Sequence, residues 1–186
     1  MQLILGSQSW GRKKVLKSAG YEFEVAPADI DEKSIRDNDP YALTDKIARA
    51  KADALKDAFP SHILITGDTV GYCNDEILEK PTSEEEYRRN IEWTQKMPLQ
   101  FISSVVVTDT KNNIQLSAVD TATVTYSNIP DDVLEKVIAK GVYGRYAAGI
   151  ATEEPLLLPF ITVIGEKSTA MGLPLKEFKE LLNKVI

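Results

Sequence analysis

Near its N-terminus the chain reads LILGSQSWGRKKVLKSAG, residues 3–20. Three apolar residues lead into a short polar loop, and a basic segment follows in which Val15, Leu16 and Ala19 recur at helical spacing. This pattern predicts a strand, a loop and then a helix that Gly20 ends. Because the loop leads directly into the helix N-terminus, free main-chain N–H groups, two serine hydroxyls and two cations can all point at one anion.

Outward from this segment, predicted helices and strands are interspersed. We expect strands at 3–5, 22–25, 63–65, 101–109, 114–126, 146–150 and 160–164, and helices from Pro40 to Ala58, at 83–95, at 131–141 and after Pro174. Ser83 with Glu86 forms a capping box for the helix at 83–95. The strands at 101–109 and 114–126 form a long hairpin around a turn-prone segment. A mixed sheet flanked by helices, an α/β fold, therefore fits better than an all-parallel sheet.

Composition sets the broad class of the protein. The 186 residues have a net charge of −6, with 43% apolar and 27% charged residues, which is typical of a globular chain. No apolar run approaches the roughly 20 residues of a membrane span. One cysteine, Cys73, and one histidine, His62, exclude a disulfide framework and a Cys/His zinc site within one chain. We expect a single domain, residues 1–186, in the cytoplasm and without a membrane partner.

The acidic total hides an uneven charge distribution. Residues 1–21 carry four bases and no acid, so this segment is +4 and the remainder is −10. An acidic protein is a poor general binder of nucleic acid, and we expect no stable binding of that kind. A local group of cations can still hold a small phosphorylated ligand, although a solvated helix face is the alternative interpretation.

Acidic and basic residues elsewhere indicate the same kind of ligand. Glu32 follows a predicted strand, and Asp68 follows another directly, where open α/β sheets bind ligands. Two carboxylates meeting there suit Mg²⁺ with substrate phosphates, or one of them could accept a proton from an attacking water. Lys51 lies beside Ile47 next to the apolar stripe of its helix, and Lys80 precedes a proline. Each lysine could contact phosphate oxygens or simply extend to solvent.

Six short motifs follow one another along the chain: Ser7-x-Ser9-x-x-Arg12-Lys13, Asp29-Ile30-Asp31-Glu32, Ile47-Ala48-Arg49-Ala50-Lys51-Ala52, Gly67-Asp68-Thr69-Val70, Ile77-Leu78-Glu79-Lys80-Pro81 and Gly172-Leu173-Pro174-Leu175. Together they resemble the motifs of the Maf-like nucleotide pyrophosphatases. Each fragment is common, but six of them in order, at matching spacing from residue 4 to residue 175, are specific.

The resemblance implies an elongated, twisted mixed sheet with two lobes and a central cleft, a fold shared with the inosine triphosphate pyrophosphatases. It also implies the reaction NTP + H₂O → NMP + diphosphate, a divalent metal (Mg²⁺ or Mn²⁺), and often a homodimer. The substrates of this family are non-standard or pyrimidine nucleotides, and those of another branch include 7-methyl-GTP.

Matching positions carry implied roles. These are catalysis for Asp68, Glu32, Lys51 and Lys80, phosphate binding for Ser7, Ser9, Arg12 and Lys13, and metal binding for Glu32 and Asp68. In this scheme Asp68 is the general base that activates water. The two lysines neutralise charge that develops on the phosphates, which agrees with the chemistry read from the residues themselves.

The chain also departs from the family pattern. Trp10-Gly11 replaces a Pro-Arg pair, residues 95–104 lack the family's histidine, and residues 145–152 lack its glutamine. Trp10 could stack on a base or pack against the core. Reaction type is therefore predicted more directly than substrate. A catalytically weak nucleotide-binding relative, a purine-specific inosine triphosphatase relative, and an acidic scaffold without a ligand are the alternatives.

Overall fold

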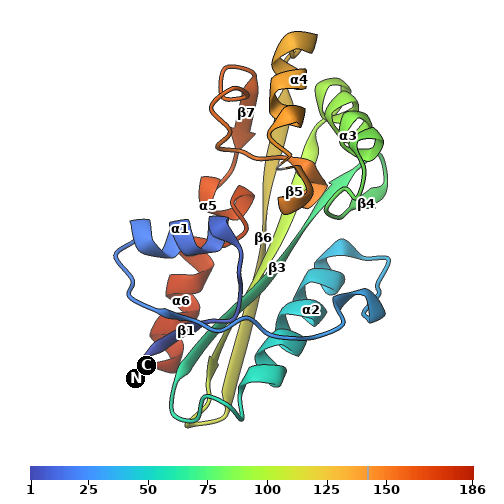
Figure 1. Cartoon of the computed structure of the whole chain (residues 1–186). Helices are drawn as coiled ribbons and strands as arrows, with labels where there is room; N and C mark the ends of the chain where they lie inside the picture. Colours follow the sequence, from blue (N-terminus) through green and yellow to red (C-terminus); the bar gives the residue numbers. More distant parts are fainter. Residues whose placement is uncertain (142) are drawn as a thin grey trace.

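The computed structural model describes residues 1–141 and 143–186. A seven-stranded mixed sheet runs along the length of the molecule in the order β2-β1-β3-β5-β6-β7, and β4 pairs with β3 (Figure 1). The strands are β1 (Leu3–Leu5), β2 (Glu24–Val25), β3 (Ile63–Cys73), β4 (Glu76–Leu78), β5 (Leu99–Asp109), β6 (Ile114–Tyr126) and β7 (Ile161–Ile164). Strand β1 is parallel to β2 and β3, whereas the other pairs are antiparallel, which confirms the predicted mixed sheet.

Helices flank this sheet. The α-helices are α1 (Trp10–Ser18), α2 (Pro40–Leu55), α3 (Glu84–Lys96), α4 (Asp131–Ala139), α5 (Lys167–Ala170) and α6 (Leu175–Val185), and the 3₁₀ turns are η1 (Glu32–Ser34), η2 (Tyr143–Arg145) and η3 (Ala147–Gly149). Each of the first three long helices begins at a side-chain cap, from Ser9, Asp39 and Ser83 respectively. No helix in the described part of the chain has the length and apolar character needed to cross a bilayer.

Helices α1 and α2 lie on opposite faces of the sheet. Val105 and Val107 of β5 pack in the cluster that contains α1 and α6, whereas Val106 packs against Ala48 and Ala52 of α2. Successive strand residues point to opposite faces, so α1 and α2 cover different sides. The connection through α1 leads from β1 to β2 on one side of it, and the connection through α2 leads from β2 back across to β3 on the other side of β1. Open α/β sheets bind ligands at the strand ends beside such a reversal.

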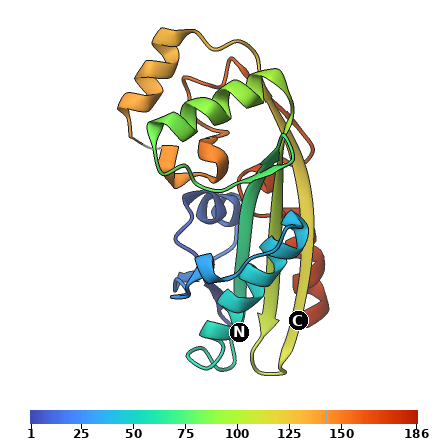
Figure 2. The same cartoon turned by 90° about the vertical axis from the view of Figure 1, so that its right-hand side faces the viewer.

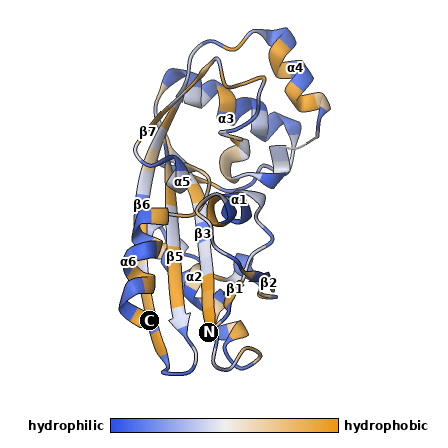
Figure 3. Ribbon diagram, turned by 90° about the vertical axis from the view of Figure 1, so that its left-hand side faces the viewer, coloured by the Kyte–Doolittle hydropathy of each residue, from blue (hydrophilic) through white to orange (hydrophobic). Residues whose placement is uncertain are grey.

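The molecule has two lobes with separate cores (Figure 2). The lower lobe contains β1, β2, α1, α2 and α6, and the upper lobe contains β4, α3, α4, η2, η3 and β7. Strands β3, β5 and β6 run through both, and Figure 3 shows apolar segments, in orange, along β3 and β5. A cavity of about 340 Å³ lies between the lobes, bounded by Leu43 of α2 on one side and by Pro81 and Asn90 on the other. The predicted two-lobed fold with a cleft is thus confirmed.

Strand β3 is much longer than the strand predicted at 63–65. Its polar segment Thr66-Gly67-Asp68-Thr69 stays in the sheet because residues 63–72 pair continuously with β5. Asp68 therefore lies inside a strand, which corrects the expectation that it follows one. The helix predicted to reach Ala58 ends at Leu55, and Ala54 and Ala58 are exposed.

The strand predicted at 146–150 is wrong. These residues form the tight turn η3, in which Ala148 and Gly149 have φ values of 53° and 77°. The main-chain N–H of Ala148 donates to the carbonyl of Glu79 (2.8 Å). A Cβ added at Gly149 would lie 2.6 Å from the Tyr87 ring, so close packing against α3 bends the segment.

Candidate active site

The centre of β3 provides the starting point of the site. Asp68 and Thr69 are adjacent, so their side chains leave the strand on opposite faces, toward α2 and α1 respectively. Asp68 is 9% exposed, and its main-chain N–H donates to Ser104 Oγ (3.1 Å). A Cβ at Gly67 would lie 2.5 Å from the Ser104 carbonyl oxygen, so only glycine permits this close approach of β3 and β5.

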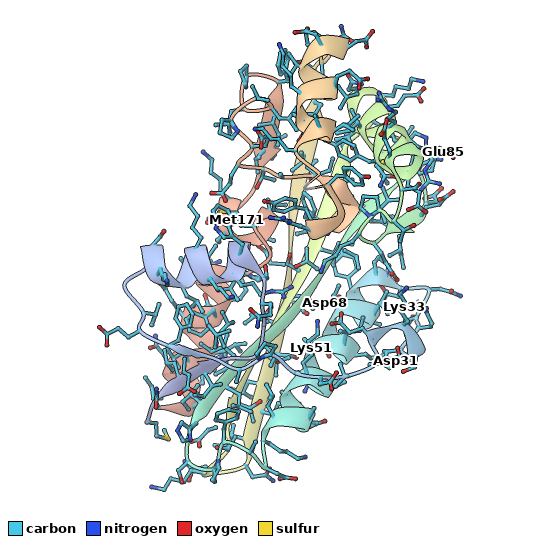
Figure 4. The ribbon with its side chains drawn as sticks, viewed as in Figure 1. Asp31, Lys33, Lys51, Asp68, Glu85 and Met171 are labelled. Carbon is cyan, nitrogen blue, oxygen red and sulfur yellow. The ribbon has the colours of Figure 1, made fainter. Side chains whose placement is uncertain are left out.

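Lys51 joins two carboxylates beside β3. Its Nζ lies 3.0 Å from Asp68 Oδ1 and 3.1 Å from Glu32 Oε2, and Figure 4 shows Lys51 and Asp68 facing each other. Lys51 is 6% exposed, so the alternative in which it extends to solvent is wrong. Glu32, on η1, has a side chain about half exposed. One shared cation offsets the repulsion that two neighbouring carboxylates would otherwise have.

Arg12 of α1 approaches the same region from the other face of the sheet. Its Nε donates to the Gly172 carbonyl (2.8 Å), Nη1 to Ser7 Oγ (2.9 Å) and Nη2 to Thr69 Oγ1 (3.2 Å). Burial lowers the pKa of the Arg12 guanidinium, while the negative charges of Asp68 and Glu32 act in the opposite direction. The guanidinium is thus buried near both carboxylates and held by contacts within the protein.

The predicted phosphate-binding turn precedes α1. Ser7 Oγ accepts the main-chain N–H of Ser9 (3.1 Å), and Ser9 caps the helix by accepting that of Arg12 (3.4 Å). Lys13 is half-buried, and its Nζ donates to Gln8 Oε1 (2.8 Å). The turn leaves the N–H groups at the start of α1 beside two serine hydroxyls and two cations, an arrangement that favours an anion.

The structure shows what Trp10 and Gly11, two residues that depart from the family pattern, contact. Trp10 is 54% exposed, and Lys14 Nζ lies 4.8 Å from its ring centroid, so Trp10 does not pack into the core. A Cβ at Gly11 would lie 2.2 Å from the Met171 carbonyl oxygen. The missing side chain at Gly11 therefore lets α1 rest directly on the turn before α6.

Lys80 is the predicted site residue that lies apart from the others. It is exposed, and no hydrogen bond or ion pair joins it to another described residue. It borders the cavity between the lobes, together with Arg36, Glu79 and Arg89. The structure thus brings Glu32, Lys51 and Asp68 into direct contact, and Lys80 faces the cleft from the upper lobe.

The sequence model of the family described as Maf-like protein matches residues 2–185. The chain belongs to the Maf-like family. A "7-methyl-GTP pyrophosphatase" of Dictyostelium discoideum is 36% identical over 98% of this chain and 96% of that protein. A "nucleoside triphosphate pyrophosphatase" of Pelagibacter ubique is 29% identical over 97% and 96% of the two chains. A "dTTP/UTP pyrophosphatase" of Geotalea uraniireducens is 27% identical over 98% and 94%.

Sequence reasoning missed three groups at this Maf-like site: Thr69, the Gly172 carbonyl and Ser104. Thr69 and Gly172 lie inside motifs that carried the family resemblance, so a signal for them existed. Their use as partners of Arg12 depends on contacts between segments far apart in sequence. Ser104 lies in a segment where the family motif is lost, and no local pattern marked it.

The oxygen atoms of the site decide which kind of metal ion it can bind. Within residues 1–141 and 143–186, no group of three or more His, Cys, Asp or Glu side chains is placed to hold a metal ion. Glu32 and Asp68 do offer carboxylate oxygens around one Lys51 nitrogen. Mg²⁺ usually takes only one or two carboxylates and fills its other positions with water and substrate phosphates. The donor set therefore fits a metal that arrives with a nucleotide rather than one caged by protein alone.

Proposed function

We propose that this Maf-like protein is a pyrophosphatase that hydrolyses a nucleoside triphosphate to the monophosphate and diphosphate. The observation that carries the proposal is Lys51 held between Asp68 and Glu32, close to the guanidinium of Arg12. Such a site combines a carboxylate able to accept a proton with cations able to hold a polyanion. The names of the relatives, which are pyrophosphatases of nucleotides, support the same reaction.

In this proposal Asp68 accepts the proton of the attacking water. Its position is fixed because its main chain belongs to a central strand and bonds to Ser104, while Lys51 orients the carboxylate. A positioned general base contributes about 10²- to 10⁴-fold to a rate. Lys51, once a substrate is bound, also offsets negative charge that builds up on the phosphates during bond cleavage.

The turn at residues 6–13 binds the polyphosphate. Ser7, Ser9, Arg12 and Lys13 surround the first N–H groups of α1, where the helix dipole adds to their attraction for an anion. Lys80 reaches the substrate from the upper lobe across the cavity, which explains why it has no protein partner among the described residues. The two lobes thus hold opposite sides of one bound nucleotide.

A divalent cation, Mg²⁺ or Mn²⁺, completes the proposed site and would be held by Glu32, with Asp68 as a second ligand. When bound it would neutralise phosphate charge and polarise the phosphoryl oxygens. We place the reaction in the cytoplasm, consistent with a single cysteine that is free and buried. We also propose that the protein forms a homodimer, as the family resemblance implies.

The proposed substrates are methylated, pyrimidine or other non-standard nucleoside triphosphates. A panel of 7-methyl-GTP, UTP, dTTP, ITP and the standard nucleotides with Mg²⁺ or Mn²⁺, read by diphosphate release, tests this. Turnover of at least one methylated or pyrimidine nucleotide well above that of Asp68→Asn supports the proposal. Binding without turnover would instead favour a regulatory relative, and a preference for ITP over all others would favour an inosine triphosphatase.

A further inference from the structure

A chain of hydroxyl groups, which begins at the half-buried Thr69, crosses the sheet behind Arg12. Thr69 Oγ1 lies 3.0 Å from Ser103 Oγ, and Ser103 Oγ donates to the Thr169 carbonyl (2.8 Å). Thr169 Oγ1 in turn donates to Asp120 Oδ2 (2.5 Å). Ser103 and Thr169 are fully buried. The chain therefore links the guanidinium of Arg12 through β3 and β5 to α5 and β6.

The direction of these hydrogen bonds follows from the number of protons. Ser103 has one hydroxyl proton, and the Thr169 carbonyl can only accept, so that proton is committed there. Thr69 then donates its own proton to Ser103 Oγ at 3.0 Å rather than to the more distant Gly172 carbonyl at 3.5 Å, which leaves a Thr69 lone pair for the N–H of Arg12 Nη2. Hydrogen bonds aligned in one direction polarise and strengthen each other. Thr69 is thus fixed as an acceptor toward Arg12.

A similar count shows what Arg12 has left for a ligand. A guanidinium has five N–H donors, and three of them go to Gly172, Ser7 and Thr69. One N–H remains on each of the two terminal nitrogens. Guanidinium N–H groups held in a fixed plane are well suited to bind phosphate oxygens. The three protein partners set the plane in which that pair lies.

We propose that Thr69, supported by Ser103, is a positioning residue that holds Arg12 in the orientation needed to bind the polyphosphate. This inference rests on the proposed function, because it requires a polyphosphate at the turn before α1. It also gives β3 a double role. Asp68 and Thr69 are neighbours on opposite faces, so one dipeptide fixes the carboxylate beside Lys51 and the guanidinium of Arg12 relative to each other.

The test measures binding of inorganic triphosphate to the purified protein by calorimetry, together with KM and kcat for the best nucleotide of the panel. Thr69→Val keeps the side-chain shape and removes the hydroxyl. We expect it to weaken triphosphate binding and raise KM about tenfold, because a charge-assisted contact is lost and Arg12 reorients. Thr69→Ser restores the hydroxyl and should lie within about threefold of the unmodified protein.

A double-mutant cycle with Arg12→Lys shows whether Thr69 acts through Arg12. If it does, Thr69→Val added to Arg12→Lys should weaken binding by less than about twofold, since the coupled partner is already gone. Thr94→Val is the matched control, because Thr94 is a fully buried hydroxyl on α3 whose one partner among the described residues is the Asn90 carbonyl in its own helix. It should leave binding unchanged.

Three outcomes would overturn the inference: equal binding by Thr69→Val and the unmodified protein, failure of Thr69→Ser to restore binding, or additive effects in the cycle. In each of these cases nucleotide hydrolysis by the unmodified protein would remain, so the proposed function would stand. Loss of triphosphate binding and of hydrolysis in the unmodified protein itself would overturn both.

Discussion

Lys51→Met is the substitution that probes the site most sharply. Methionine keeps the length and the apolar stem of the side chain but removes the ammonium group between Asp68 and Glu32. Lys51 and Asp68 are 6% and 9% exposed, so the carboxylate of Asp68 loses its partner in a place that water hardly reaches. Removing one member of a buried pair costs about 3–5 kcal/mol. Glu32 adds little to this because its side chain is about half exposed.

We therefore expect a loss of about 3 kcal/mol in the free energy of unfolding, at the lower end of that range because Arg12 still lies close to Asp68. Lys46→Met on the same helix is the matched control. Lys46 pairs with Asp37 at 2.5 Å, but its side chain is 55% exposed, and such surface pairs contribute about 0.5 kcal/mol or less. Added salt should reduce the stability loss caused by Lys46→Met more than the loss caused by Lys51→Met, because it screens exposed charges more strongly than buried ones.

Urea unfolding at neutral pH, followed by circular dichroism, measures both variants against the unmodified protein. If the unfolding free energy falls with urea concentration at the same slope in all three proteins, the folded and unfolded states are equally compact in each. The urea midpoints then report the differences in stability directly. If Lys51→Met were as stable as Lys46→Met, Lys51 would not neutralise a buried carboxylate, and the described geometry of the site would be refuted.

The remaining predictions concern packing, acid stability, the thiol and the metal. Gly11→Ala places a Cβ 2.2 Å from the Met171 carbonyl oxygen, so it should lower the free energy of unfolding by about 1–3 kcal/mol despite better helix propensity, as urea unfolding will show. Burial alone would raise the pKa of Asp109, but hydrogen bonds from Asn112 and from the Lys111 main chain hold it below its usual value. A depressed folded pKa gives stability that is present above about pH 4 and lost as pH falls further, so the stability difference between Asp109→Ala and the unmodified protein should shrink in acid titrations. Burial raises the pKa of the Cys73 thiol, so it should react slowly with a thiol reagent at neutral pH until the protein is unfolded. Chelation with EDTA should abolish diphosphate release, and added Mg²⁺ or Mn²⁺ should restore it; full activity after chelation would exclude the metal.

Local patterns were sufficient for much of the fold. Half of the predicted capping box at Ser83 is present: Ser83 Oγ accepts the Glu86 N–H, whereas the Glu86 carboxylate accepts the N–H of Thr82 instead of that of Ser83. The hairpin of β5 and β6 also lies where alternation and a turn predict it. These features depend on residues close in sequence, so propensity and side-chain caps determine them.

Features that depend on distant segments could not be predicted in this way. The polar stretch at residues 66–69 resembles a loop, and only its pairing with β5 keeps it in a strand. Helical periodicity places Lys51 beside Ile47, but its partners come from η1 and β3. Arg12 was predicted to bind phosphate from its motif. Its bond to Gly172, which lies 160 positions away, depends on the tertiary fold.

Diphosphate release by Asp68→Asn, compared with the unmodified protein on its best nucleotide, tests most directly whether this carboxylate activates water. Asparagine keeps the shape of the side chain, and equal melting temperatures would show that both proteins are folded. We expect the nucleoside monophosphate and diphosphate as the products, and a rate for Asp68→Asn that is lower by about 10²- to 10⁴-fold. Equal rates for the two proteins, or release of orthophosphate and a nucleoside diphosphate, would contradict the proposed function.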